Sequence, residues 1–155
     1  MAAALRERIY GSIACLSTLL IITGYPLSQP WGEVVDVLVA TGGLWAASVL
    51  SDYVAHLAVH QHTPTGRELA HMVRVSGQII GASAVPLLLL VLAGLAILPS
   101  HTAVWIGIWV LVAEMGLFAL VSVRRTSFPW WGRFLLIVSL MALGLLVVFL
   151  KTLAH

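Results

Sequence analysis

The sequence predicts an all-α integral membrane protein, a single domain built as a helical bundle with five transmembrane helices. Its 155 residues are 61% hydrophobic and only 9% charged, whereas a soluble domain has about 25% charged residues. The mean hydropathy is +1.05. So few polar residues cannot cover a surface in water, so we expect the chain to be embedded in a lipid bilayer.

Five apolar segments follow one another along the chain, each with roughly the 20 residues that cross a hydrocarbon core about 30 Å thick. Only helices satisfy their own backbone hydrogen bonds there without closing a barrel. The first segment follows Arg6 and Arg8, and prolines at positions 26 and 30 end it. The five predicted spans cover about residues 9–25, 33–61, 67–98, 102–123 and 131–150.

The second and third spans are longer than the bilayer needs. About 29 residues at 1.5 Å per residue give roughly 43 Å of helix. We expect the excess to project from the membrane as a cytoplasmic helical hairpin. Thr65 and Glu68 fit a capping box that begins the third span, and Pro64 discourages the helix from running through.

The basic residues predict the orientation. Seven of the eight fall on one side of a five-span chain, before the first span and around the connections from second to third and from fourth to fifth. By the positive-inside rule this side is cytoplasmic, which places the N-terminus inside and the C-terminus outside the cytoplasmic membrane. The net charge of +2 and the absence of a basic patch argue against nucleic acid as a partner. The seven residues are Arg6, Arg8, Arg67, Arg74, Arg124, Arg125 and Arg133.

Glu114 lies near the middle of the fourth span, where a charge costs at least about 3 kcal/mol. With Ser48 and Asp52 of the second span it forms the predicted path for protons or small cations. The alternative is structural: a neutral Glu114 bonded to hydroxyl groups holds the helices together. Its expected neighbours in depth include Ser17, Thr18 and Ser48.

Histidines cluster at the inner ends of the second and third spans. In an antiparallel hairpin we expect His56 opposite His71 and His60 opposite Glu68. Imidazole and carboxylate groups at such spacing suit a divalent metal, zinc or iron. Two alternatives remain open: an Asp52–Arg74 ion pair with the histidines in a wet interfacial layer, and a cluster that responds to protons. The predicted metal ligands are His56, His60, His71 and Glu68.

Other features favour structural roles. Glu33 and Asp36 begin the second span, where the helix dipole favours acids, so capping is the expected role. Gly77 and Gly81 form a GxxxG motif, which predicts close packing within the chain or between copies. We find no nucleophile elbow, no phosphate-binding loop and no HExxH motif, so nothing in the sequence identifies a catalytic nucleophile.

From about residue 30 onward, the chain resembles a family of uncharacterised small membrane proteins, mostly of actinobacteria. The resemblance implies the fold and topology, and it brings no assigned activity. The family pattern has a histidine at the position of Ser48 and an acidic residue at that of Ser76. The shared features are Trp45, Arg67-Glu68, Ala82-Ser83, Arg124-Arg125, Gly144 and the ending Leu150-Lys151-Thr152-Leu153-Ala154-His155.

Two functions of different kinds are consistent with these observations. The first is an oligomeric channel or carrier for protons or cations, since five short spans leave little room for a path within one copy. The second is a non-catalytic accessory or structural subunit in which the polar residues only pack. A metal-dependent membrane enzyme is a third and more distant alternative.

Overall fold

A computed structural model describes residues 2–25 and 29–124, and the positions 131–132, 134–135, 138–139, 142 and 149. Within the two long ranges the chain forms α-helices joined by turns, with no strand, which confirms the all-α class. The helices are α1 (Ala2–Ile22), α2 (Pro30–His60), α3 (Gly66–Ser76), α4 (Gln78–Gly94) and α5 (Ser100–Arg124).

Three helical stretches are long and apolar enough to cross a membrane: Pro30–His60, Gly66–Gly94 and Ser100–Phe118. They correspond to the predicted second, third and fourth spans, so the protein is membrane-embedded. Helix α1 is shorter in its apolar part, because its charged residues end at Arg8 and residues 9–22 give about 21 Å of helix. The predicted fifth span lies mostly outside the described residues.

Helix boundaries follow local backbone chemistry. Helix α2 begins at Pro30, three residues before the predicted start, because proline suits the first helical position. The predicted single helix over 67–98 is divided at Gly77 into α3 and α4, and it ends at Gly94. There Ala96 takes the left-handed conformation, with φ of 57°, and the chain turns toward α5.

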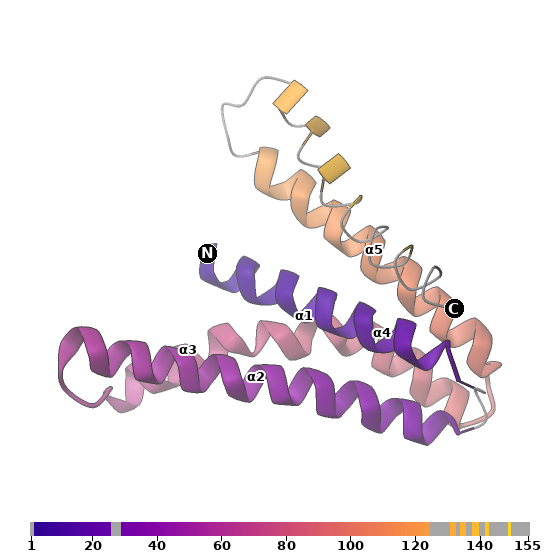
Figure 1. Ribbon diagram of the computed structural model, residues 1–155, viewed down its shortest axis with the longest axis horizontal. Helices are drawn as coiled ribbons and strands as arrows, with labels where there is room; N and C mark the ends of the chain where they lie inside the picture. The colour runs from indigo at the N-terminus through magenta and orange to yellow at the C-terminus, as the bar shows by residue number, and fades with distance from the viewer. Residues whose placement is uncertain are drawn as a thin grey trace.

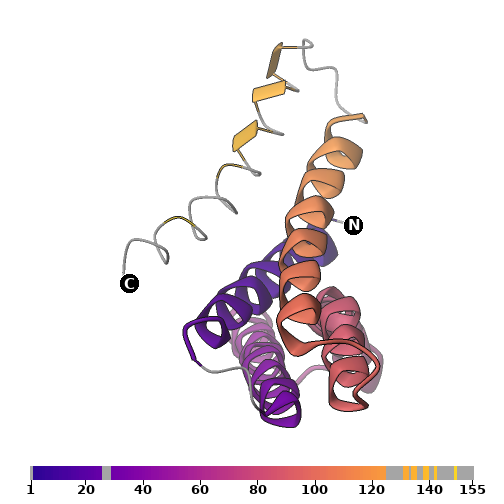
Figure 2. The same ribbon diagram turned by 90° about the vertical axis from the view of Figure 1, so that its right-hand side faces the viewer.

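Helix α1 packs against α2, α4 and α5, while α2 runs beside α3 and α4 (Figures 1 and 2). The core between these helices is apolar, and in lipid such packing stabilises mainly through van der Waals contact. Helix α5 leaves α2 at an angle, so the two helices diverge toward the end of α5 (Figure 1). Fully buried core residues include Leu16, Leu19, Val37, Leu90 and Leu111.

Glycine permits the closest approach between helices. A Cβ atom on Gly11 of α1 would lie 2.6 Å from the carbonyl oxygen of Ile79 in α4, so only glycine fits there. The predicted GxxxG motif has no such role within the described structure. A Cβ atom on Gly81 would meet nothing within 4 Å, and one on Gly77 would meet only its own helix.

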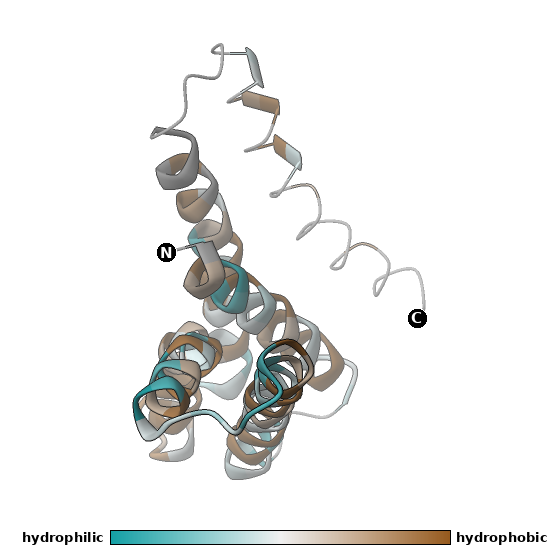
Figure 3. Ribbon diagram, turned by 90° about the vertical axis from the view of Figure 1, so that its left-hand side faces the viewer, coloured by the Kyte–Doolittle hydropathy of each residue, from teal (hydrophilic) through white to brown (hydrophobic). Residues whose placement is uncertain are grey.

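The turn between α2 and α3 has the predicted capping box. The Thr65 amide donates to Glu68 Oε2 at 2.7 Å, and the Glu68 amide donates to Thr65 Oγ1 at 3.4 Å. Gln61 ends α2 in the left-handed conformation, with φ of 57°. Hydrophilic residues gather at this end of the molecule, as Figure 3 shows.

Candidate functional site

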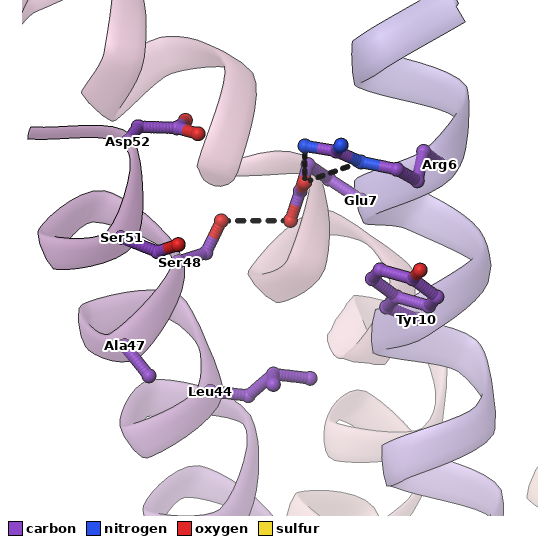
Figure 4. A pocket seen from close by; sticks show the side chains of 8 residues that line it. All are labelled: Arg6, Glu7, Tyr10, Leu44, Ala47, Ser48, Ser51 and Asp52. Carbon is purple, nitrogen blue, oxygen red and sulfur yellow. Dashed lines mark hydrogen bonds and ion pairs between the residues drawn. The ribbon is translucent and has the colours of Figure 1, made fainter. Parts of the chain in front are cut away.

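A pocket of about 330 Å³ lies between the start of α1 and the second half of α2 (Figure 4). Its charged and hydroxyl groups gather at one end, while Leu44 and Ala47 line the other (Figure 4). This volume is within the range of small-molecule sites and has room for several water molecules. The lining residues are Arg6, Glu7, Tyr10, Leu44, Ala47, Ser48, Ser51 and Asp52.

Helical spacing explains why these side chains meet. Arg6 and Tyr10 are four residues apart on α1, so they lie on the same side of that helix. On α2, positions 44, 48 and 52 follow one another at the same interval, with 47 and 51 beside them. The two faces oppose each other across the pocket, as Figure 4 shows.

Glu7 is the centre of a buried hydrogen-bond network. Its side chain is only 3% exposed. Arg6 donates to Glu7 Oε1 from Nε at 3.1 Å and from Nη2 at 2.8 Å. Ser48 Oγ donates to Glu7 Oε2 at 2.8 Å, and Ser76 Oγ of α3 lies 3.1 Å from Ser48 Oγ. Because a carboxylate only accepts hydrogen bonds, the Ser48 hydroxyl donates to Glu7. Its single hydrogen is then used, so the Ser76 hydroxyl is the donor to Ser48.

Asp52 is the carboxylate of the pocket that has no hydrogen bond or ion pair within the described chain. It is half-buried and close enough to Arg6 to interact electrostatically. The predicted Asp52–Arg74 ion pair does not form, and the ion pairs of the described helices are Arg6–Glu7 and Arg8–Glu114. With two acids and one base, the pocket favours a positively charged occupant over an anion.

Glu114 is separate from this pocket. Arg8 of α1 donates to Glu114 Oε1 from Nε at 3.0 Å and from Nη2 at 2.8 Å. Arg8 also lies over the Phe118 ring, 4.8 Å from its centroid. The expected hydroxyl partners were wrong, because α1 begins at Ala2 and brings a guanidinium, a stronger partner for a carboxylate, to α5. The structure therefore brings Ser48 and Asp52 together but not Glu114.

The histidines also have a different arrangement from the predicted one. The Ser48–Ser76 bond fixes the register of α2 against α3. Eight residues onward from Ser48 is His56, and eight residues back from Ser76 is Glu68, whose carboxylate interacts electrostatically with His56. We expected His56 to lie opposite His71, but this register places it opposite Glu68.

Three imidazole rings gather at the end of α2, and one of them, His62, is not among the predicted ligands. His56 stacks on His60 with centroids 4.3 Å apart, and the His62 ring lies 5.3 Å from that of His56. His71 is exposed and makes no ring contact in the described chain. No three His, Cys, Asp or Glu residues of the described ranges are grouped so as to hold a metal ion, since stacked rings face each other with π-surfaces and not with nitrogens. The metal site stays a prediction.

Sequence reasoning missed the α1 side of the pocket: Arg6 and Arg8 were interpreted only as cytoplasmic anchors. The signal was present, because Glu7, Gly11 and Cys15 are spaced four residues apart and form one face of a helix that begins before Arg6. A buried acid next to two arginines is then expected to pair within the bundle.

The chain matches no protein-family model, no curated protein and no solved structure.

Proposed function

We propose that this chain is a five-span protein of the cytoplasmic membrane that moves protons or small cations, either as a homo-oligomeric channel or as a carrier. The N-terminus is then cytoplasmic and the pocket lies in the inner half of the bilayer. The observation that supports this proposal is Asp52, which has no hydrogen bond or ion pair among the described residues and lies beside the buried Glu7 network, in a chain with so few charges.

The chemistry of the pocket suits a proton or a small cation. Asp52 is available to bind it, while Arg6 offsets the charge of Glu7 and prevents two bare carboxylates from facing each other. The hydroxyl groups of Ser76 and Ser48 form a short chain that ends on Glu7. A hydroxyl group accepts one proton as it donates another. In this proposal the row of hydroxyl groups therefore passes protons from Ser76 of α3 toward Glu7 of α1.

A flux assay tests the proposal. The purified protein is reconstituted in liposomes, and proton and monovalent cation flux are measured for the wild type, Asp52→Asn and the control Asp36→Asn. Asparagine fills the same volume but neither titrates nor carries charge, so we expect Asp52→Asn to abolish flux. Asp36 is exposed at the other end of α2, so its variant should behave as wild type. Equal flux in the wild type and Asp52→Asn would refute the role of Asp52.

A second function, an accessory or structural subunit, is favoured by the apolar core. Beyond the pocket, the main core cluster between α1, α2, α4 and α5 is tightly buried and apolar. The buried hydroxyl groups of Ser12, Thr41 and Ser83 each donate to a carbonyl oxygen of their own helix and not to another helix. In this case the polar network only joins helices. Wild-type protein without flux above that of empty liposomes would support this function over transport.

A divalent metal at the hairpin, and a metal-dependent activity with it, is a third proposal. The observation that supports this proposal is that the imidazole rings of His56, His60 and His62 gather at the end of α2. Zinc and iron analysis of protein purified without chelator tests this proposal, and metal-free protein would end it.

A further inference from the structure

Glu33 is a buried acid at the opposite end of α2 from the pocket. Its side chain is 6% exposed, and neither carboxylate oxygen has a hydrogen-bond partner in the described structure. It lies on the same face of α2 as the buried residues Val37 and Thr41. Glu33 lies in the first turn of α2 as predicted, but its carboxylate accepts no hydrogen bond from the free amides there, so it does not cap the helix by hydrogen bonding.

A buried carboxylate cannot remain charged and alone. Buried charges in proteins are paired or coordinate a metal, since the loss of hydration otherwise costs many kcal/mol. In the described helices, the cations that form ion pairs are Arg6 and Arg8. They pair with Glu7 and Glu114 at the start of α1, far from Glu33. No cationic side chain of the described residues therefore forms an ion pair with Glu33.

A metal cation is a poor occupant for this position. Calcium and magnesium take about six or more oxygen ligands, whereas Glu33 offers two oxygens. Asp36, one turn later, is exposed and not part of the buried face. A proton needs no further ligand, and it removes the charge that burial opposes.

We infer that Glu33 is a proton-binding site at the outer end of α2, and that the transported ion is the proton. This inference rests on the proposed function, because it assigns Asp52 and Glu33 to the two ends of one path. At 1.5 Å per residue the two acids lie about 28 Å apart along α2, close to the thickness of the hydrocarbon core of about 30 Å. Thr41 is a buried hydroxyl between them, bonded to the Val37 carbonyl oxygen at 2.7 Å.

Labelling with dicyclohexylcarbodiimide tests whether Glu33 holds a proton. This apolar reagent enters the bilayer and reacts with a protonated carboxyl group. The carboxyl proton moves to a carbodiimide nitrogen, and the carboxylate oxygen bonds to the central carbon. The resulting O-acylisourea rearranges to a stable N-acylurea, so the peptide gains the mass of the whole reagent. We expect mass spectrometry of the protein in liposomes to find this adduct on Glu33, less of it as pH rises, and none on the exposed Asp36. Folded protein with no adduct on Glu33 at any pH would overturn the inference.

Flux measurements test whether Glu33 belongs to the path. We expect Glu33→Gln to lose proton flux and Asp36→Asn to keep it, while Glu33→Asp, which keeps a titratable group, retains part of it. Retained flux in Glu33→Asp separates loss of the proton site from loss of folding. Wild-type flux that persists in Glu33→Gln would overturn the assignment of Glu33 to the path. Wild-type protein without flux would refute the proposed function, and the labelling result would still decide whether Glu33 binds a proton.

Discussion

Three consecutive charged residues on α1, Arg6, Glu7 and Arg8, have different surroundings. Their directions determine which polar residues of the neighbouring helices they bind. Glu7 turns toward α2 and binds Ser48, whereas Arg8 turns toward α5 and binds Glu114. Arg6 stays near the surface and pairs with Glu7. Successive side chains on a helix point about 100° apart, so a run of three charges reaches two neighbouring helices at the same depth.

The Arg8–Glu114 ion pair should stabilise the packing of α1 on α5. We expect Arg8→Met and Glu114→Gln each to lower the free energy of unfolding by about 1–2 kcal/mol, since the pair is partly exposed and each single variant leaves a partner behind. In a double-mutant cycle, the coupling energy should be about 1 kcal/mol. Detergent titration in mixed micelles gives the four free energies. Additive losses would show that the pair contributes nothing beyond its separate residues.

Sequence reasoning at the residue scale found Ser48 and Asp52 but not the α1 residues that face them across the pocket. Rarity of polar groups in an apolar chain identifies such residues, and both line the pocket. Partners depend on which faces oppose each other, and an apolar span matches many registers about equally well. The Ser48–Ser76 bond selects one of them, which is why His56 lies opposite Glu68. The burial of Glu33 also depends on how the helices pack, and no local sequence pattern predicts it.

Among the elements, length and breakers predicted the helices well, because both are local. Prolines and the capping box at Thr65 set the boundaries of α2 and α3 within a few residues. Helix α1 was predicted less well, because its start was placed after the charged residues and not before them. The division at Gly77 and the close contact at Gly11 depend on tertiary packing, which hydropathy does not report.

The contact of α1 with α4 depends on Gly11. A methyl group at this position would lie 2.6 Å from the Ile79 carbonyl oxygen, which belongs to the backbone and cannot rotate away. We expect Gly11→Ala to lower the free energy of unfolding by about 1–3 kcal/mol. Its matched control is Gly81→Ala, which meets nothing within 4 Å and should raise stability by up to about 1 kcal/mol. Detergent titration measures both variants. An unchanged Gly11→Ala would contradict the close approach, and a loss in Gly81→Ala would indicate that a second copy packs on this face.

At the scale of the whole molecule, contacts across the bundle place the basic residues of the first three helices at one end. Glu7 near the start of α1 bonds to Ser48 in the second half of α2, and Ser48 contacts Ser76 at the end of α3. Helix α1, with Arg6 and Arg8, therefore starts in the half of the molecule that contains the α2–α3 turn, which projects beyond it with Arg67 (Figure 1). This arrangement is consistent with the orientation that loop charges predict, and in the proposed topology the pocket lies in the inner half of the bilayer.

Reporter fusions test this orientation and the number of spans together. A reporter that is active only outside the cytoplasm should be active when fused after His155 and inactive when inserted within residues 61–65. A reporter that needs the cytoplasm should give the opposite pair of results. The physical reason is that an odd number of spans puts the two termini on opposite sides, while the basic residues hold the N-terminus and the α2–α3 turn inside.

Because α1 has only about 21 Å of apolar helix, the decisive control is a fusion in the connection between α1 and α2. Activity there outside the cytoplasm means that α1 crosses the membrane despite its length. Activity there only inside would leave α1 on the cytoplasmic side and contradict the five-span topology.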